Sequence, residues 1–434
     1  MSVTQPVERV HDLVGVGFGP SNLALAIAVT EHNRTAPAGR RLSAAFIERQ
    51  ESFGWHRGML IDGATMQISF LKDLATPRNP TSGFSFVSYL HDKGRLVDFT
   101  NHQCLFPSRV EFHDYLEWCA ARFADDVAYG HEVTEIRAAH DGAGSDVTEL
   151  EVRTTPRRGS APAGTWRARN LVLATGLRPH LPAGAVASDR VWHNEQLVRR
   201  AAGISPDSSP RFMVVGAGQS AAETLEYLHR RFPRSPIYSV FAKYGFTPAD
   251  DSPFVNGIFD PGAVPTFFNA SRAVKEAVVA HHRNTNYSVA DTELIEELYR
   301  RSYQERVLGE ERLRFLNLSR VLRVEETGEH LVVSTEFLPT GEVREDEVDV
   351  LVYATGYRPA DPLPLLGSLA AQCKRDAEDR VQVDLDYRVS TTGSVTCGIY
   401  LQGPTEHTHG LSSTLLSNTA VRAGAIVESI AAHR

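Results

Sequence analysis

The stretch FMVVGAGQSAAETLEYL at residues 212–228 reads as an apolar strand, a glycine turn and a helix, and HDLVGVGFGPSNLALAIA at residues 11–28 repeats this pattern. Small residues at such a turn let backbone N–H groups at a helix N-terminus approach a pyrophosphate. One turn alone is weak evidence for a dinucleotide site. Two copies, each between a strand and a helix, predict two such sites, built on Gly15, Gly17, Gly19 and Pro20 and on Gly216, Ala217, Gly218, Gln219 and Ser220.

Strands and helices alternate around these turns, which predicts an α/β fold with two Rossmann-like dinucleotide-binding domains. The residues 147–155 and 167–174 flank the polar run RRGSAPAG and predict a hairpin. We expect a helix at 293–307 and further strands at 42–48, 211–215, 237–241, 331–337 and 348–354.

A second pair of similar stretches, the echo, indicates how the domains connect. LVLATGLRP at residues 171–179 is closely similar to LVYATGYRP at residues 351–359. Each copy is an apolar strand stopped by Thr-Gly, where the backbone can turn without a bulky side chain. We expect the chain to leave one domain at the first copy and return at the second. This predicts a first domain from 10–178 and 351–434, interrupted by a second domain at 179–350 with a small, mostly helical substrate-binding region at about 248–305.

The strand ends distinguish the two predicted sites. The strand after the first turn ends in Glu48, whose carboxylate can accept hydrogen bonds from ribose hydroxyls, as the adenosine of FAD offers. The strand after the second turn carries no acid and ends at Lys243, which favours the 2′-phosphate of NADPH. A chain with both sites is expected to pass a hydride from a nicotinamide to a flavin.

The cysteines bear on where the electrons go next. Cys104, Cys119, Cys373 and Cys397 are scattered and form no CxxC pair, so neither a zinc site nor a redox dithiol is indicated. His407 and His409 have no acid at a useful spacing, and we assign no metal. Oxygen is the remaining acceptor, which predicts a monooxygenase or an oxidase.

Composition restricts the partners and the compartment. The 434 residues carry a net charge of −8 without a basic block, which argues against nucleic acid and anionic membranes. No run approaches the roughly 18 apolar residues of a membrane span, and the first residues lack a secretory h-region. With so few cysteines, the sequence favours the cytoplasm.

Several stretches resemble the microbial L-ornithine N5-monooxygenases, the flavin-dependent N-hydroxylating enzymes of hydroxamate siderophore and related pathways. The matching stretches run nearly end to end and include MQISFLKDLATPRNPTSGFSFVSYL at 66–90, FPSRVEFHDYLEW at 106–118, DDSPFVNGIFDP at 250–261, HRNTNYSV at 282–289 and TEHTHGLSSTLLSN at 405–418. The resemblance implies that NADPH reduces FAD, that the flavin captures O2 as a C4a-hydroperoxide, and that the amine of L-ornithine takes the distal oxygen. It also implies a homotetramer or a homodimer.

The resemblance implies a role for named residues. Ornithine would be held by Lys72, Asn256, Asn286 and Ser413. FAD would contact residues 48–56, among them Trp55 and His56, together with Gln67, Val133 near the adenine, and Gly410, Leu411 and Ser412 near the isoalloxazine. NADPH would contact Ala217 to Ser220 with Arg109, Asn286, Tyr287 and Ser288, and Ala242 stands where relatives often carry an arginine, beside Lys243.

Alternatives remain open on the sequence alone. Lys72 could form an internal ion pair with Asp73 or another acid, and Asn256 and Asn286 could cap turns, which is the commoner use of asparagine. Trp55 could equally be core packing. At the level of function, the alternatives are a lysine or diamine N-hydroxylase, and an uncoupled NADPH oxidase or flavin redox sensor.

Overall fold

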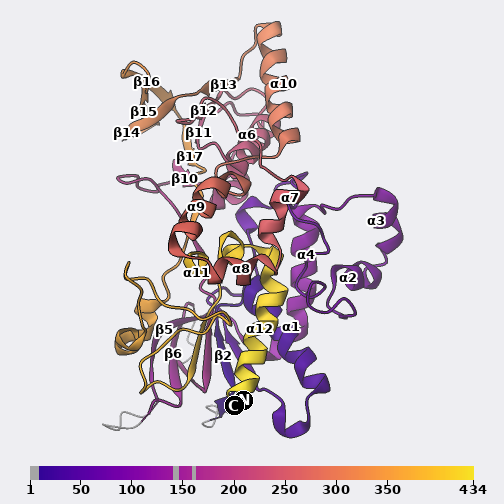
Figure 1. Cartoon of the computed structure of the whole chain (residues 1–434). Coiled ribbons are helices and arrows are strands. Elements are labelled where there is room, and N and C mark those ends of the chain that lie inside the picture. The colour runs from indigo at the N-terminus through magenta and orange to yellow at the C-terminus, as the bar shows by residue number, and fades with distance from the viewer. Residues whose placement is uncertain (1–8, 140–145, 159–162) are drawn as a thin grey trace.

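The computed structural model describes residues 9–139, 146–158 and 163–434, which form two α/β halves (Figure 1). The lower half of the picture contains both ends of the chain, and the upper half is built from the middle of the sequence. Four residues of the predicted hairpin loop, 159–162, lie outside the described residues.

The first half is organised around a five-stranded parallel sheet whose central strand leads into the first glycine turn. Its strand order is β19 (Gly398–Leu401), β8 (Asn170–Leu173), β2 (Leu13–Val16), β3 (Ala44–Ile47) and β4 (Val127–Ala128). One apolar core lies between this sheet and the helices α1 (Pro20–Thr35), α4 (Arg109–Ala120) and α12 (Thr419–Ala432). A second core covers the other face, beneath a smaller sheet of β1 (Val10–His11), β7 (Gly164–Ala168), β6 (Leu150–Pro156) and β5 (His131–Ala138).

The second half repeats this plan around the second glycine turn. Its parallel sheet has the order β10 (Val191–His193), β17 (Val350–Tyr353), β11 (Phe212–Val215), β12 (Ile237–Val240) and β13 (Leu313–Leu316). The helices α6 (Gln219–Arg231) and α10 (Thr292–Leu308) pack on one face. An antiparallel meander of β14 (Ser319–Thr327), β15 (His330–Phe337) and β16 (Glu342–Val348) covers the other face.

The two similar stretches of the echo occupy equivalent positions in the two halves. In each half, a three-stranded antiparallel unit is followed by a strand that pairs beside the glycine-turn strand, which is β8 next to β2 and β17 next to β11. Thr-Gly then ends both strands, and the chain continues into β9 (Leu177–Pro179) or β18 (Tyr357–Pro359). These two short strands pair antiparallel and carry the chain between the halves.

The pairing of β17 corrects the predicted domain boundary. We expected residues 351–434 to belong to the first domain, but β17 lies in the sheet of the second half, between β10 and β11. The chain therefore returns to the first half after β18 rather than at residue 351. The echo correctly indicated a repeated unit. Its two strands, however, occupy equivalent positions in two different sheets, and an apolar sequence does not show to which sheet a strand belongs.

Two predicted strands are divided for the same reason. The expected strand at 167–174 spans the end of β7 and all of β8, with Arg169 between them. The expected strand at 348–354 spans the last residue of β16 and all of β17, with Asp349 between them. In both places the chain passes from an antiparallel unit into a parallel sheet without losing its apolar character. The predicted hairpin itself is confirmed by the antiparallel pairing of β6 with β7.

Two insertions contribute residues to the space between the halves. Residues 48–126 leave β3, form α2 (Phe86–Asp92), α3 (Leu96–His102) and α4, and return to β4. The predicted helical region is observed as α7 (Pro253–Asn256), α8 (Ala263–Asn269), α9 (Arg272–His282) and α10, and α7 to α9 lie near α11 (Glu406–His409) in the middle of the molecule (Figure 1). The helix α5 (Leu197–Ala201) follows β10.

Candidate functional site

A cavity of about 2660 Å³ extends between the halves and is lined by both glycine turns. Its wall also includes residues from β9 and β18, from α9, and from the segment after α11. Sites for single small ligands usually occupy about 300–1,000 Å³. The space is therefore large enough for two dinucleotides and a small substrate.

The first glycine turn is shaped for a diphosphate. Gly17 has φ of +84°, and a Cβ there would lie 2.4 Å from the carbonyl oxygen of Ala174, so a larger residue would displace the turn. At Gly19 a Cβ would meet no described atom within 4 Å, which leaves open space before α1. The first turn of α1 has neither an acidic residue nor, among the described residues, a side-chain cap. Its N–H groups and its dipole suit an anion.

The second turn has the same geometry. Gly216 has φ of +144°, and its Cβ would lie 2.4 Å from the carbonyl oxygen of Ala354, the residue that corresponds to Ala174 in the echo. The helix α6 begins at Gln219 without a side-chain cap in the described chain and without an acid in its first turn. The residues present therefore fit a dinucleotide at each turn.

Glu48 directly follows β3, which ends one residue before the predicted strand end, and is 5% exposed. One carboxylate oxygen accepts a hydrogen bond from the Phe18 backbone N–H at 2.6 Å, and the other accepts from Gln50 N–H at 2.8 Å. Each oxygen has a second lone pair. Glu48 therefore fixes the backbone of the first turn and keeps acceptor capacity toward the cavity, which it lines.

Arg109, which is predicted to contact NADPH, forms a bidentate ion pair with Glu223. Its guanidinium donates to both carboxylate oxygens of Glu223 at 2.8 and 2.6 Å, and the two side chains are 12% and 5% exposed. Burial opposes the charge of Arg109, but the hydrogen bonds and charge of Glu223 outweigh this effect and raise its pKa. Since Arg109 lies on α4 and Glu223 on α6, the pair joins the two halves at the cavity.

Gln67 and Gln219 extend this connection. The Gln219 side chain donates to Glu223 at 3.0 Å and to Asp291 at 2.8 Å, and its oxygen accepts from the Asp291 backbone N–H. The Gln67 amide donates to the other oxygen of Asp291 at 3.4 Å. These residues, assigned by resemblance to cofactor contacts, thus already hold the insertion of the first half against the second.

Trp55 and His56 lie at the cavity wall, where the ring of His56 stands edge-on to the rings of Trp55 and Tyr357, at 4.7 and 5.6 Å between centroids. The backbone of His56 is left-handed, with φ of 48°. Burial, followed by the nearby charge of Arg109, lowers the pKa of His56 to about 4. The imidazole is therefore neutral near pH 7.

Lys72 lines the cavity and is one-third exposed. Its ammonium lies 3.9 Å from a carboxylate oxygen of Asp260, an acid of the helical region. The alternative partner, Asp73, instead accepts hydrogen bonds from the backbone N–H groups of Ala75, Thr76 and Phe86. Lys72 thus has a long, exposed ion pair and can turn to another carboxylate.

The two asparagines also reach the cavity wall. The Asn256 side chain donates to the Asp251 carbonyl at 2.8 Å, which is the turn-capping use. The backbone N–H of Asn286 donates to the Arg283 carbonyl at 3.3 Å, and its side chain makes no hydrogen bond within the described part of the chain. Val133, Tyr287 and Ser288 share the lining.

Some expected contacts lie elsewhere. Gly15 and Lys243 are outside the lining, and the Lys243 ammonium donates to the Ser288 carbonyl at 2.5 Å while burial lowers its pKa. Leu411, Ser412 and Ser413 are at most 2% exposed and, with Gly410, stand behind the wall rather than in it. The Ser413 hydroxyl meets no hydrogen-bond partner among the described residues. Ser413 is therefore not among the residues that line the cavity, and its contact with ornithine stays a prediction.

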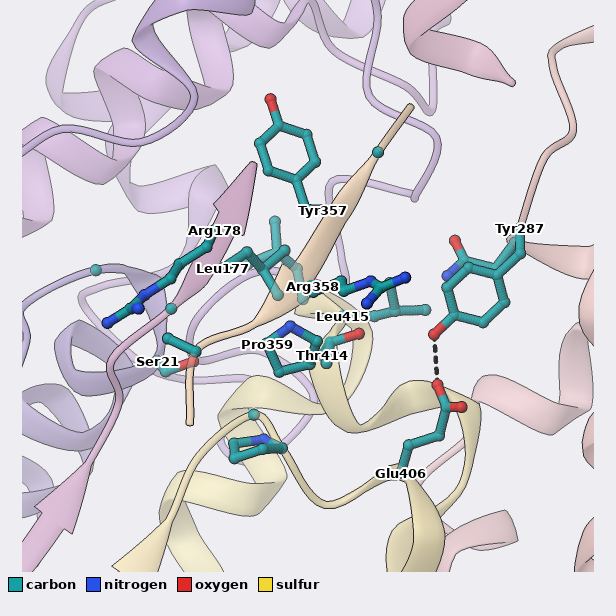
Figure 2. A pocket seen from close by; sticks show the side chains of 18 of the residues that line it. Ser21, Leu177, Arg178, Tyr287, Tyr357, Arg358, Pro359, Glu406, Thr414 and Leu415 are labelled. Carbon is teal, nitrogen blue, oxygen red and sulfur yellow. Dashed lines mark hydrogen bonds between the residues drawn. The ribbon is translucent and has the colours of Figure 1, made fainter. Parts of the chain in front are cut away.

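Several lining residues escaped the sequence analysis. Glu406 is one of them, and it accepts a hydrogen bond from the hydroxyl of Tyr287, a residue that the resemblance did name (Figure 2). Burial together with this acceptor raises the pKa of Tyr287 strongly. Arg178 and Arg358 are partners in the ladder of β9 and β18, and their side chains extend to opposite sides (Figure 2). The echo contained both arginines and Tyr357 in LRP and YRP, and it was the available signal for them.

The described residues include no group of three or more His, Cys, Asp or Glu side chains arranged to hold a metal ion. His407 and His409 instead contact the carbonyl oxygens of Val381 and Leu385. Within the described ranges, none of the helices is both long enough and apolar enough to cross a membrane.

Both glycine turns fit a diphosphate, and both line the same cavity. This arrangement is typical of a two-domain, dinucleotide-binding protein of the oxidoreductase type. The family model described as L-lysine 6-monooxygenase/L-ornithine 5-monooxygenase matches residues 9–359, and the chain belongs to this family. It is 39% identical to the L-ornithine N(5)-monooxygenase of Pseudomonas aeruginosa, over 98% of this chain and 94% of the relative. It is also 39% identical to that of Emericella nidulans, over 98% and 90%.

Solved structures agree. The ornithine N-hydroxylase KtzI of Kutzneria sp. 744, with reduced FAD, NADP+ and L-ornithine, is 49% identical with a TM-score of 0.92, covering 97% of this chain and 99% of that one. The L-lysine 6-monooxygenase of Pseudomonas syringae is 31% identical with a TM-score of 0.84, covering 98% and 99%. The predicted family and fold class are confirmed.

Proposed function

We propose that this chain is an FAD- and NADPH-dependent L-ornithine N5-monooxygenase, which uses O2 to convert L-ornithine into N5-hydroxy-L-ornithine. The observation that carries the proposal is its 49% identity, over nearly the whole of both chains, to the Kutzneria ornithine N-hydroxylase. Lysine relatives match at lower identity, and the ammonium of Lys72 at the cavity wall would favour an amino acid, which has a carboxylate, over a diamine.

The residues divide the work between them. Bound FAD and NADPH would supply the two electrons with which O2 is reduced, so that one oxygen atom reaches the amine and the other leaves as water. We assign FAD to the first turn and Glu48, and NADPH to the second turn with Arg109 in support. Lys72 would leave Asp260 to bind the ornithine carboxylate, and Asn256 and Asn286 would orient the polar groups next to it. The cavity then fixes the distance to the amine and excludes water.

The test is product analysis with ornithine, lysine and putrescine in parallel, counting hydroxylamine formed per NADPH consumed. We expect nearly one hydroxylamine per NADPH with ornithine and mainly hydrogen peroxide with the other two. Equal or better coupling with lysine or putrescine would transfer the assignment to those substrates. Hydrogen peroxide in full stoichiometry with every amine would identify an NADPH oxidase or a redox sensor instead.

The reaction is expected to accelerate with pH because the substrate amine must be neutral to accept oxygen. An alkyl amine with a pKa near ~10.4 is neutral in only about one molecule in 2,500 at pH 7. The lining histidines His56 and His407 have lowered pKa values, His56 to about 4, mainly through burial, so they are already neutral above their ordinary pKa. We predict that kcat/KM for ornithine rises up to about tenfold per pH unit from about pH 6.5 to 8.5. Equal values at both ends would contradict this account.

We further propose that the protein self-associates through α10. Tyr299, Tyr303 and Val307 are 73%, 57% and 68% exposed and stand four residues apart on one face of this helix. Acidic residues gather in its first half and arginines in its second, so two copies packed antiparallel would set opposite charges face to face. We predict that a Tyr299→Lys/Tyr303→Lys variant sediments as a smaller species than the wild type, with unchanged FAD content. A wild-type monomer at micromolar concentration would refute the proposal.

We also propose that the enzyme works in the cytoplasm and supplies hydroxamate siderophore or related biosynthesis. All four cysteines are free in the structure, as suits a reducing compartment, and NADPH is required. Fractionation should place the activity in the cytosolic extract. Loss of the gene should abolish a hydroxamate product that added N5-hydroxyornithine restores, and continued production without the gene would count against this role.

A further inference from the structure

Arg422 is a buried cation without an acidic partner in the described residues. It lies on α12, is 3% exposed, and has no ion pair within the described ranges. Its guanidinium donates only to uncharged oxygens, at 3.2 Å to the Gln402 side chain, 2.5 Å to the Ser413 carbonyl, and 3.2 and 3.3 Å to the hydroxyls of Ser21 and Thr419.

Two other arginines with little exposure, 19% and 12% for their side chains, are each neutralised by a nearby acid. Arg78, which packs against Gly424 on the same helix, lies 2.7 Å from the Glu31 carboxylate, and Arg109 has Glu223. Burying an unpaired charge is costly, and burial accordingly lowers the pKa of Arg422. An arginine retains its proton even so. Because no acid of the described residues pairs with Arg422, the arrangement calls for an anion from outside them.

The hydrogen bonds of Arg422 lead to the first glycine turn. The Gln402 amide donates to the Ser21 carbonyl at 3.3 Å and to the Asn22 side chain at 2.9 Å. Asn22 in turn donates to the Gly17 carbonyl at 2.7 Å. Ser21 and Gly17 line the cavity, whereas Asn22 and Gln402 are at most 2% exposed. The guanidinium thus lies on the buried side of the N-terminus of α1 and contacts it through the side chain of Ser21.

We propose that Arg422 is a positioning residue for the diphosphate of FAD, supplying from behind the first glycine turn the charge that this dianion needs. It rests on the proposed function only in so far as FAD binds at this turn. The N–H groups of α1 would contact the diphosphate, and Arg422 would act through Ser21 and through the backbone that Gln402 and Asn22 hold. Its buried charge is therefore uncompensated in the apoprotein and neutralised in the holoenzyme.

The experiment is a fluorescence titration of FAD into FAD-free protein, with thermal midpoints of both forms, for wild type, Arg422→Met, Arg422→Lys and the matched control Arg78→Met. We expect Arg422→Met to weaken FAD binding by at least about tenfold, because a unit charge at this range in a partly solvated site is worth a decade or more. Its apoprotein should melt no lower than wild-type apoprotein, and NADPH affinity should be unchanged. Arg422→Lys should stay within about threefold of wild type.

The control separates charge from packing. Arg78→Met should lower the midpoint of the apoprotein and leave FAD affinity within about twofold, because its charge is already paired. If Arg422→Met instead lowers the apoprotein midpoint and weakens FAD and NADPH together, or if it binds FAD like wild type, the proposal is overturned. A wild-type protein that takes up no FAD would defeat the proposed function itself.

A pH series covers the case in which Arg422→Met does not fold. A buried lysine loses its proton far more readily than an arginine. The titratable neighbours stay neutral in this pH range, because burial raises the pKa of Tyr387 and lowers the pKa of His409 to about 4. FAD binding to Arg422→Lys should therefore weaken about tenfold from about pH 7 to 9.5, while wild type changes by less than about threefold. Parallel profiles would overturn the proposal.

Discussion

A Lys72→Ala variant is expected to lose about a hundredfold in kcat/KM for L-ornithine, mostly through a higher KM. A charge-assisted contact with a carboxylate is worth about 1.5–3 kcal/mol, and each 1.4 kcal/mol changes affinity about tenfold. Lys72 lines the cavity, is one-third exposed, and has only a 3.9 Å contact with Asp260 to give up. Steady-state kinetics with direct measurement of hydroxylamine would check this expectation.

Two comparisons isolate the carboxylate contact. Turnover of a diamine, which has no carboxylate, should change by less than about threefold in Lys72→Ala, since uniform binding through Lys72 is the interaction removed. Asp260→Asn should keep or lower the KM for ornithine, because it frees the ammonium from its present partner. An unchanged KM in Lys72→Ala, or an equal loss with ornithine and the diamine, would mean that another group holds the amino acid.

A Glu223→Leu variant is expected to lose about 3–5 kcal/mol in the free energy of unfolding. The substitution leaves the guanidinium of Arg109 buried without its bidentate partner, and breaking a buried pair on one side costs this much. The effect should be felt where α4 meets α6, so the two halves should separate earlier during unfolding. Chemical denaturation followed by circular dichroism would measure the loss.

The double variant Arg109→Leu/Glu223→Leu is the control. It removes both charges, and replacement of a whole buried pair by apolar side chains is often neutral. We expect it to recover most of the stability that Glu223→Leu loses, although it would lack the charge near the predicted NADPH site. If the double variant is as unstable as the sum of two single ones, packing rather than the ion pair holds the halves together.

The fold was largely predictable because its signals are local. A glycine turn between a strand and a helix needs only neighbouring residues, and both turns appear as expected, with Gly17 and Gly216 at positive φ. The echo pointed to a repeated unit, but an apolar run such as LVY is compatible with either sheet. For this reason the boundary at residue 351 was wrong, and β17 belongs to the second half.

The site was predictable in part. Lys72, Asn256 and Asn286 all line the cavity, and their contact with ornithine stays a prediction. The pairing of Arg109 with Glu223 spans 114 residues of sequence, and no periodicity announces such a contact. Ser413 follows the expected motif, yet the short turn at Leu411–Thr414 directs it behind the wall. Arg422 lies within an ordinary helical pattern, and only the three-dimensional structure shows that it has no acidic partner among the described residues.

Because β9 and β18 pair with each other, the segment between them begins and ends at the same place in the structure and could be exchanged as one unit. Its two ends arrive on neighbouring strands, which lie about 5 Å apart. A replacement whose own termini are equally close would leave the first sheet unchanged and need no linker. Grafting at the two Arg-Pro junctions could thus give the same flavin half a different nicotinamide preference, and gene recombination has the same route open to it.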